Sequence, residues 1–162
     1  MADNRDQFVE VQHFYQQPLV WVVWLIFAML VYYLMAQGLI FDTVGYLVIA
    51  LALGANLFIF VMRLETRVDR AGVHYRMWPF HRSFRHLSWE EIQQAEVRAY
   101  RPLREYGGYG IRIGLQGKAY NVKGKMGLQL VLRNGKRILI GTQEADLLAE
   151  VLHRVQPART RT

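Results

Sequence analysis

The chain has 162 residues, of which 52% are hydrophobic, and it carries 20 Lys and Arg against 13 Asp and Glu, a formal net charge of +7. This length corresponds to one domain, or to one small domain with an appendage. The absence of cysteine excludes a disulfide framework and any metal site built on thiolates, and it fits a reducing compartment.

The first eighteen residues predict a short segment that lies at a membrane surface. Phe8, Val11 and Tyr15 recur at helical spacing with polar residues between them, and Pro18 suits the first turn of a following helix. We expect residues 1–18 to form a cytoplasmic interfacial segment with a short helix. A disordered tail is the alternative for residues 1–7.

Two uncharged apolar runs follow, Leu19–Ala36 and Tyr46–Met62. Each would span roughly 26 Å as a helix, close to the thickness of a thin bilayer. Neither run has the polar stripe that a helix in a soluble core usually keeps. A cleaved signal peptide is excluded for the first run because it lacks a basic region before it and a small-residue cleavage site after it. Residues 19–62 are therefore interpreted as a transmembrane hairpin.

The distribution of positive charge predicts the orientation of this hairpin. The connector Gln37–Gly45 has no Lys or Arg, whereas 19 of the 20 basic residues and 9 of the 13 acidic ones follow Met62, an excess of ten positive charges. The positive-inside rule then places both termini in the cytoplasm. We expect a multi-pass protein of the inner (cell) membrane.

The second run contains residues suited to packing between helices. Ala50 and Gly54 are four residues apart, the spacing of small residues that lets two helix backbones approach closely. Asn56 lies in the middle of the run, where an unpaired amide is costly, so we expect a hydrogen-bond partner within the hairpin or on another subunit.

After Met62 the pattern changes to short alternating runs separated by turn residues. The stretch Asp69–Gly72 predicts a hairpin turn, and Asn134-Gly135 predicts a two-residue type I′ turn. Ser88 and Glu91 have the spacing of a capping box, which predicts a single helical turn. We expect about seven strands: Leu64–Val68, Val73–Trp78, Ser83–Leu87, Ala95–Tyr100, Gly110–Leu115, Leu128–Leu132 and Arg137–Ile140.

A C-terminal helix is predicted to begin near Thr142 and to end at Pro157. One apolar stripe can cover the open end of an antiparallel sandwich or open barrel. The expected domain therefore comprises residues 63–156, followed by a basic flexible tail at 157–162. The stripe consists of Leu148, Val151, Leu152 and Val155.

The order and spacing of these features resemble the small bacterial membrane proteins, many without an assigned function, that carry a pleckstrin-homology-like (PH-like) domain behind a transmembrane hairpin. The resemblance implies a membrane α-hairpin of two helices and a mainly-β PH-like barrel of about seven strands, capped by a C-terminal α-helix. It also implies no catalysis and a role in recruitment or assembly. The features that carry it are the segment Leu64–Arg76, Pro79–His81, the Ser88-Trp89 turn with Ile92, Asn134-Gly135 and the final helix.

Relatives that bind inositol phosphates present lysine and arginine in a fixed pattern on their first two strands. This chain has only arginines there, at another spacing: Arg63, Arg67, Arg70 and Arg76. We therefore expect general attraction to anionic headgroups rather than specific phosphoinositide binding, with about 1 kcal/mol contributed by each basic residue near the surface.

The stretch Tyr100–Arg112 is the main candidate for a binding site, because it places cationic and aromatic side chains on what we expect to be a hairpin tip. The structural alternative, which we favour, is that Glu105 pairs with Arg101 or Arg104 and the tyrosines pack on the barrel. A second basic loop, Gln116–Lys125, is a weaker candidate. The partner- or lipid-binding candidates are Arg101, Arg104, Tyr106, Tyr109, Arg112, Lys118, Lys123 and Lys125; the helix-packing candidates are Ala50, Gly54 and Asn56.

No pattern of catalytic residues is recognisable in the sequence, so we expect a protein that is not an enzyme and uses no cofactor, metal or small-molecule substrate. The histidines are scattered, and no carboxylate group or cysteine completes a ligand set around them. A membrane-held domain also argues against nucleic acid. The expected partners are membrane lipids and a protein, either a second copy or the larger complex of which this chain is an accessory subunit. The histidines are His13, His74, His81, His86 and His153.

Overall fold

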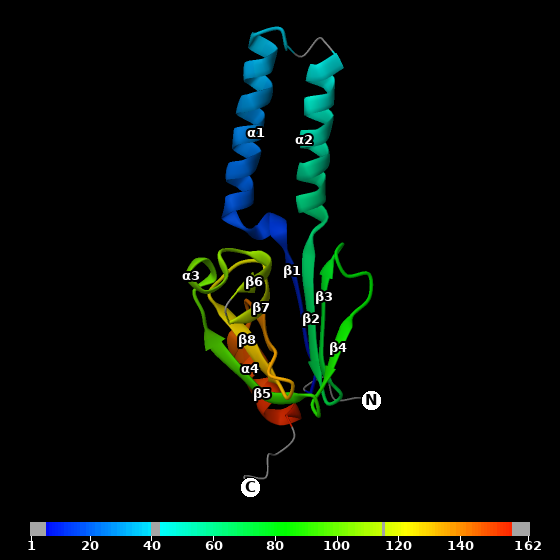
Figure 1. Ribbon diagram of the computed structural model, residues 1–162, viewed down its shortest axis with the longest axis vertical. Coiled ribbons are helices and arrows are strands. Elements are labelled where there is room, and N and C mark those ends of the chain that lie inside the picture. Colours follow the sequence, from blue (N-terminus) through cyan, green and yellow to red (C-terminus); the bar gives the residue numbers. More distant parts are fainter. Residues whose placement is uncertain (1–5, 40–42, 115, 157–162) are drawn as a thin grey trace. The chain divides into compact units, whose positions relative to one another are not determined.

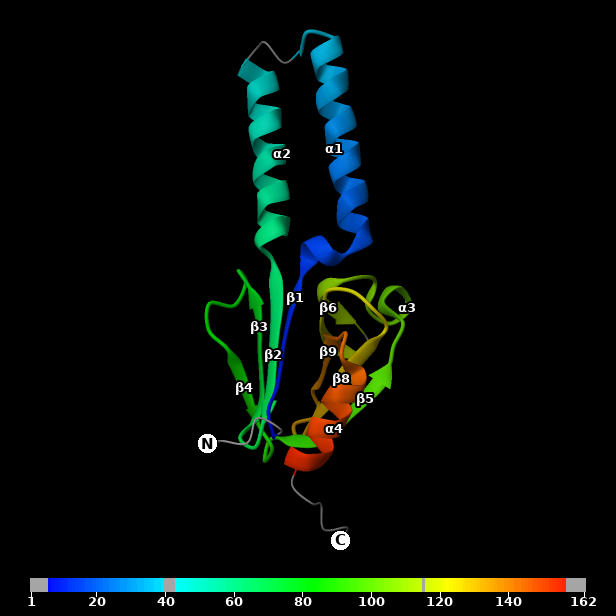
Figure 2. The same ribbon diagram turned by 180° about the vertical axis from the view of Figure 1, so that it is seen from behind.

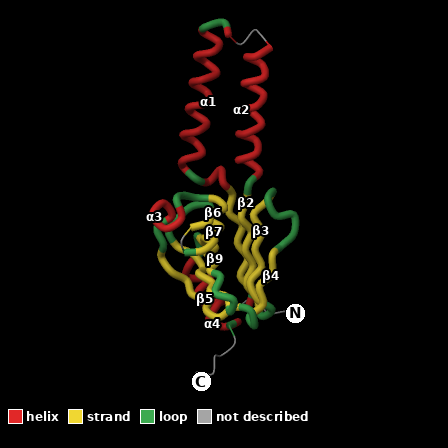
Figure 3. Tube along the Cα trace, viewed as in Figure 1, coloured by secondary structure: helices red, strands yellow, loops and turns green. Residues whose placement is uncertain are grey.

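The computed structural model describes residues 6–39, 43–114 and 116–156, and divides the chain into two compact units. The helical unit comprises residues 13–62, and the β-rich unit comprises the residues up to Gln12 and those from Arg63 onward. Helix and strand are segregated between them, apart from two helices in the β-rich unit (Figure 3). The predicted tail at 157–162 and part of the predicted connector lie outside the described residues.

The helical unit contains two 19-residue helices, α1 (Pro18–Ala36) and α2 (Thr43–Val61). Both are long and apolar enough to cross a membrane, with a mean hydropathy of 2.3, which agrees with the prediction of two apolar spans. Pro18 is the first residue of α1, as its fixed backbone angle favours. A short 3₁₀ helix, η2 (Phe14–Gln16), precedes α1, and the Phe14 amide donates a hydrogen bond to the Met62 carbonyl at 3.1 Å.

The β-rich unit contains a four-stranded and a five-stranded sheet that do not form a closed barrel (Figure 1), whereas the resemblance implies a PH-like barrel of about seven strands. One sheet has the order β1-β2-β3-β4 and the other the order β5-β8-β9-β7-β6. Strands β7 and β9 pair in parallel, whereas the pairs β2–β3, β3–β4, β5–β8, β6–β7 and β8–β9 are antiparallel. The strands are β1 (Phe8–His13), β2 (Arg63–Asp69), β3 (Gly72–Trp78), β4 (Arg85–Ser88), β5 (Ile92–Ala99), β6 (Gly110–Gly114), β7 (Gly117–Asn121), β8 (Met126–Leu132) and β9 (Arg137–Thr142).

The helix predicted near residues 8–15 is wrong, because Phe8–His13 forms strand β1 beside β2. Burial alternates along the strand: Val9 and Val11 are about half exposed, whereas Phe8, Glu10 and Gln12 are buried. The inward polar side chains have specific partners. Gln12 donates to the Gly141 carbonyl at 2.7 Å, and the Glu10 carboxylate accepts from the Thr142 hydroxyl at 2.6 Å. Paired polar groups therefore face inward where an amphipathic helix was expected.

The predicted hairpin of β2 and β3 is confirmed, with Asp69 opposite Gly72 at the turn. The Asp69 carboxylate accepts hydrogen bonds from the amides of Ala71 and Gly72, at 2.8 and 3.2 Å, which is typical of an Asx turn. Gly72 has φ +149°, and a Cβ there would lie 2.1 Å from the Leu87 carbonyl oxygen. Glycine thus allows β4 to pair closely with the start of β3.

Two predicted turns form with a different geometry. The Ser88–Glu91 stretch is a hydrogen-bonded turn rather than a helical one: the Glu91 amide donates to the Ser88 carbonyl, and the Glu91 carboxylate accepts from the Ser88 amide. In the β8–β9 turn Gly135 has φ +78°, but no non-glycine residue has positive φ among those described, so the type I′ turn is excluded at Asn134. The Gly135 amide instead donates to the Leu132 carbonyl, in a longer turn that ends in left-handed glycine.

The hydrophobic core lies between the sheets and beneath the C-terminal helix. Leu64 and Met77 of one sheet and Leu128 and Leu139 of the other are fully buried. Helix α4 (Ala145–Val155) packs against β2 and β5, which belong to different sheets (Figure 2). Its buried residues are those of the predicted stripe, so that prediction is confirmed: Leu148, Val151, Leu152 and Val155.

Candidate functional site

The candidate stretch Tyr100–Arg112 is not a hairpin tip, because the strands that it connects are not neighbours. β5 and β6 form the two opposite edges of the five-stranded sheet. The connection between them contains a short helix, α3 (Pro102–Tyr106), and Tyr106 is buried with only 4% of its surface exposed. The Tyr106 ring meets Tyr100 edge-on at 6.2 Å, so these tyrosines pack on the sheet.

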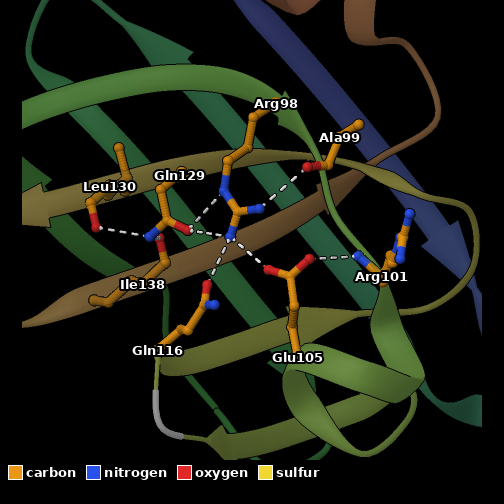
Figure 4. Close-up of polar contacts among 8 residues, drawn as sticks. All are labelled: Arg98, Ala99, Arg101, Glu105, Gln116, Gln129, Leu130 and Ile138. Atoms are coloured by element: carbon orange, nitrogen blue, oxygen red, sulfur yellow. Dashed lines mark hydrogen bonds and ion pairs between the residues drawn. The ribbon is translucent and has the colours of Figure 1, made fainter.

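A single arginine, Arg98, ties this connection to the sheet (Figure 4). Its guanidinium donates to the Glu105 carboxylate at 2.9 Å and to the Gln129 amide oxygen at 3.0 Å. Glu105 also accepts from the Arg101 backbone amide at 2.7 Å. Burial raises the pKa of Glu105, but these hydrogen bonds outweigh it and lower the pKa overall. Glu105 is therefore a structural ion-pair partner, as the favoured alternative predicted, although its guanidinium partner is Arg98 rather than Arg101 or Arg104.

Four other candidates lie near one another at the connection between β7 and β8: Tyr109, Arg112, Lys123 and Lys125. The Tyr109 hydroxyl donates to the Gly124 carbonyl at 3.5 Å, between Lys123 and Lys125, and Arg112 donates to the Tyr109 carbonyl at 2.9 Å. The predicted Gln116–Lys125 loop is itself partly a strand, because β7 spans Gly117–Asn121. Arg101 and Arg104 remain exposed on α3. Of the eight candidates only Lys118 lines the open cleft that the β-rich unit contains between its two sheets.

This concavity is an open cleft of about 1100 Å³ between the two sheets. One wall is formed by β3 and β4 of the four-stranded sheet. The other is formed by β6, β7, β9 and the β8–β9 turn of the five-stranded sheet. Because β4 and β6 are edge strands, the cleft lies where the two sheets do not close on each other. The name interlayer cleft is used for it below.

The interlayer cleft is strongly cationic. Four basic residues line it, and all four are exposed. None has a carboxylate within ion-pair distance among residues 6–39, 43–114 and 116–156. The lining carboxylate, Glu91, already accepts from the Ser88 amide and hydroxyl at 3.0 and 3.1 Å. A concavity lined by one sign of charge concentrates the field and attracts anions. The four residues are Arg85, Lys118, Lys136 and Arg137.

Aromatic side chains lie against the cationic wall. Tyr75 and Tyr120 line the cleft with ring centroids 4.9 Å apart, and the His81 ring lies 5.5 Å from Tyr120. Burial raises the pKa of Tyr75 to about 12. Burial, reinforced by Arg85 and Lys118, lowers the pKa of His81. The Tyr75 and His81 rings are thus neutral near pH 7, and neither adds to the positive charge that arginine and lysine give the cleft.

His81 has a defined protonation pattern in its neutral form. The Met77 amide donates to His81 Nδ1 at 3.3 Å, so Nδ1 is the acceptor and Nε2 carries the proton. An anion bound beside Arg85 and Lys118 would offset their positive charge and raise the pKa of His81. The histidine therefore offers a means to observe an anion in the cleft.

Sequence reasoning missed Arg85, Lys136 and Arg137 because they come from separate elements. Arg85 begins a four-residue edge strand, and the other two follow the β8–β9 turn. The adjacent pair Lys136-Arg137 after Asn134-Gly135 is visible in the sequence. Its proximity to Lys118 cannot be read from the sequence, because it depends on the parallel pairing of β7 with β9. That pairing places Lys118 opposite Ile138, next to Arg137 in the chain.

In the helical unit, the three helix-packing candidates do not share one face. A Cβ added at Gly54 would have no neighbour within 4 Å beyond the nearby backbone of its own helix, and Ala50 is also exposed. Asn56 is only 8% exposed and lines an apolar groove of about 720 Å³ between α1 and α2. At 100° per residue, Asn56 lies about 200° around the helix from Gly54. Asn56 therefore lies on a different face of α2 from Ala50 and Gly54, and the helix-packing roles of the three residues stay predictions.

Asn56 is only partly hydrogen-bonded. Its Nδ2 donates to the Ala52 carbonyl at 2.8 Å, one turn earlier, whereas its Oδ1 has no partner among the described residues. The expected partner on the facing helix is therefore not found in the described part of the hairpin.

No known protein family, curated protein or solved structure matches the chain. Among the described residues, no group of three or more His, Asp or Glu side chains could hold a metal ion.

Proposed function

We propose that this protein is a membrane-anchored, non-enzymatic binding module that captures an anionic group in the interlayer cleft. The two apolar helices cross the cell membrane, and the β-rich unit, interpreted as PH-like, lies on the cytoplasmic side. The ligand bears phosphate or carboxylate and is presented by a lipid headgroup or by a protein partner. The observation that carries this proposal is the set of four cations around one concavity without carboxylate partners among the described residues.

The exposure of the two long helices supports the membrane anchor. Only 6% of each hydrophobic window is buried, and large side chains such as Leu25 and Leu51 are more than 60% exposed. A helix in the core of a soluble protein would bury these residues, whereas a helix in lipid leaves them facing hydrocarbon.

The pairing of β1 with β2 supports an even number of membrane crossings. β1 precedes α1 and β2 follows α2, yet the two strands are neighbours in one sheet. If both helices span the bilayer, the chain returns to the side from which it started. The excess of basic residues after Met62 then favours the cytoplasm for both ends.

The test compares two variants with the same change in charge. Arg85→Glu/Lys118→Glu alters the interlayer cleft, and Arg101→Glu/Arg104→Glu alters the exposed surface of α3. Glycerol 3-phosphate and an oligoglutamate peptide serve as soluble probes of phosphate and carboxylate, titrated calorimetrically into the full chain in nonionic detergent. We expect the cleft variant to bind the preferred probe at least about tenfold more weakly, since each reversed cation contributes about 1 kcal/mol or more.

The α3 variant should bind within a factor of about two of the unaltered protein, because Arg101 and Arg104 do not line the cleft and their exposed charges are screened by salt. Equal losses in both variants would show that only the overall charge matters. If the unaltered chain binds neither probe, the proposed function is wrong. Binding should also raise the pKa of His81, which a histidine NMR titration would detect.

A second candidate function is that of an accessory subunit that joins a larger complex through its transmembrane hairpin. The unpartnered Oδ1 of Asn56 favours it, because a bilayer offers no water to satisfy a buried amide oxygen. Under this alternative, Asn56→Leu reduces the mass of the native complex after mild detergent extraction, whereas the cleft variant leaves it unchanged. An unchanged mass for Asn56→Leu would remove this candidate.

A further inference from the structure

The β3–β4 loop, residues 79–84, lies at the end of the four-stranded sheet where the chain joins the two apolar helices. Val61 ends α2 and Arg63 begins β2, so only Met62 separates them. The ladder places Trp78, the last residue of β3, directly opposite Arg63. β1 ends at His13, and its successor Phe14 donates to the Met62 carbonyl at 3.1 Å. Both connections to the helices therefore leave from the strand ends beside this loop.

The loop is held in shape by hydrogen bonds across its base. The His81 amide donates to the Met77 carbonyl at 2.8 Å, and the Met77 amide donates to His81 Nδ1 at 3.3 Å. These bonds fix the backbone on either side of Phe80. The Phe80 side chain nevertheless remains 55% exposed, and Arg82 beside it is also exposed.

The far side of the loop is anchored by cation–π contacts. The guanidinium carbons of Arg67 and Arg76 lie 4.7 and 4.5 Å from the centroid of the Phe84 ring. Phe84 is thereby tied to the sheet, because Arg67 belongs to β2 and Arg76 to β3. The Phe84 ring is thus held against the sheet, whereas more than half of the Phe80 side chain is exposed.

We propose that the β3–β4 loop is a lipid-contact element, in which the Phe80 ring enters the headgroup region of the bilayer and Arg82 binds lipid phosphate. Aromatic rings favour this region because it accepts their apolar surface, and a guanidinium matches a phosphate bidentately. Lipid is the occupant because Arg63, which pairs with Trp78 at the start of this loop, lies only two residues after the end of the second apolar helix. This arrangement orients the β-rich unit at the surface and limits its rotation about the short connections.

The inference requires that α1 and α2 are embedded in a membrane, but it does not depend on any ligand of the interlayer cleft. Loss of anion binding by the Arg85→Glu/Lys118→Glu variant would leave it intact. Conversely, if the cleft binds its anion but the β3–β4 loop stays in water, this inference is wrong and the proposed function still holds.

The absence of cysteine allows one fluorescent label to be attached at a chosen position of the full chain. Ser83→Cys places an environment-sensitive NBD label in the β3–β4 loop while Phe80 is kept, and Ala71→Cys places it in the β2–β3 turn, at the opposite end of β3. The two chains are reconstituted in nanodiscs of phosphatidylcholine and phosphatidylglycerol. We expect the label at position 83 to be quenched by nitroxide lipid and protected from iodide, and the label at 71 to behave in the opposite way.

Phe80→Ser in the Ser83→Cys background should then shift the label toward water, with less quenching by lipid and more by iodide. Leu103→Ser is the matched control, since Leu103 is 74% exposed on α3, and it should leave the label unchanged. A label at 83 that is fully open to iodide would overturn the proposal, as would one insensitive to Phe80→Ser. Protection from both quenchers would indicate a covering protein and would also overturn it.

Discussion

The two units of this protein use the same apolar residues in opposite ways. In the β-rich unit Leu64 and Leu128 are fully buried, whereas in the helical unit Leu25 and Leu57 are more than 60% exposed. Composition does not separate the two cases, because leucine contributes to both. The difference shows that the β-rich unit buries an apolar core of its own, whereas the helical unit leaves its apolar surface exposed, as expected of two helices long and apolar enough to cross a membrane.

The prediction with the largest expected effect compares the same leucine-to-alanine substitution in the two units. Leu64→Ala should destabilise the β-rich unit by about 3 kcal/mol, because it leaves a cavity in a closely packed core. Leu25→Ala should leave the free energy of unfolding of that unit unchanged, within about 0.5 kcal/mol. Chemical denaturation of the full chain in detergent, followed by tryptophan fluorescence, measures both. Equal losses would show that the α1 surface packs against protein.

Buried polar groups sharpen the comparison. Glu65 is 7% exposed, and its carboxylate accepts from Arg63 and Arg76, each at 2.7 Å. Glu65→Ala should cost about 2–4 kcal/mol, because it leaves the half-buried Arg76 without its partner. Glu150→Ala is the matched control, since its ion pair with Arg154 is exposed, and it should cost less than about 0.5 kcal/mol.

Two glycines give the next contrast. Gly72→Ala should destabilise the β-rich unit by about 2 kcal/mol, because the backbone has positive φ and the new Cβ meets the Leu87 carbonyl. Gly54→Ala has open space around it and should not weaken the helical unit, since alanine favours helix by about 1 kcal/mol. Thermal unfolding measures the first, and native mass in detergent the second. A smaller complex for Gly54→Ala would mean that this face meets another helix.

The smallest expected effect is a change in pH dependence at Glu10. Burial raises the pKa of Glu10, although hydrogen bonds from Thr142 and Gln143 oppose it. A raised carboxyl pKa in the folded state means that stability is fully present below the ordinary value of 4.5 and is lost as the pH rises through the folded value. Glu10→Gln should flatten this slope above pH 4.5, measured as the denaturation midpoint. An unaltered slope would contradict the assignment.

Local sequence patterns predicted the elements whose partners are near in the chain. The β2–β3 hairpin and the α4 stripe were predicted correctly because a turn residue and a 3.6-residue period are local signals. β1 was missed because its inward residues are polar, and their partners Gly141 and Thr142 lie more than 125 residues away. Its apolar residues also happened to match a helical spacing.

The candidate site was less predictable than the fold. The Tyr100–Arg112 stretch looked like a hairpin tip because strands that are consecutive in sequence usually pair, and here β5 and β6 lie at opposite edges. The interlayer cleft depends on that arrangement, since it brings Lys118 and Arg137 to one wall and leaves Arg85 on the other. No local pattern encodes this proximity, because it arises from the order of strands within the second sheet.

The neighbouring positions of β1 and β2 also set the order of events during biosynthesis. The first strand leaves the ribosome before either apolar helix, but the strand beside which it pairs is made only after both. Until then its edge is unpaired and open to aggregation. In a nascent chain that inserted only one helix, β1 and β2 would lie on opposite sides of the bilayer. The four-stranded sheet could then not be completed. For a chain whose helices cross a bilayer, completion of that sheet therefore requires that the two helices are inserted as a pair.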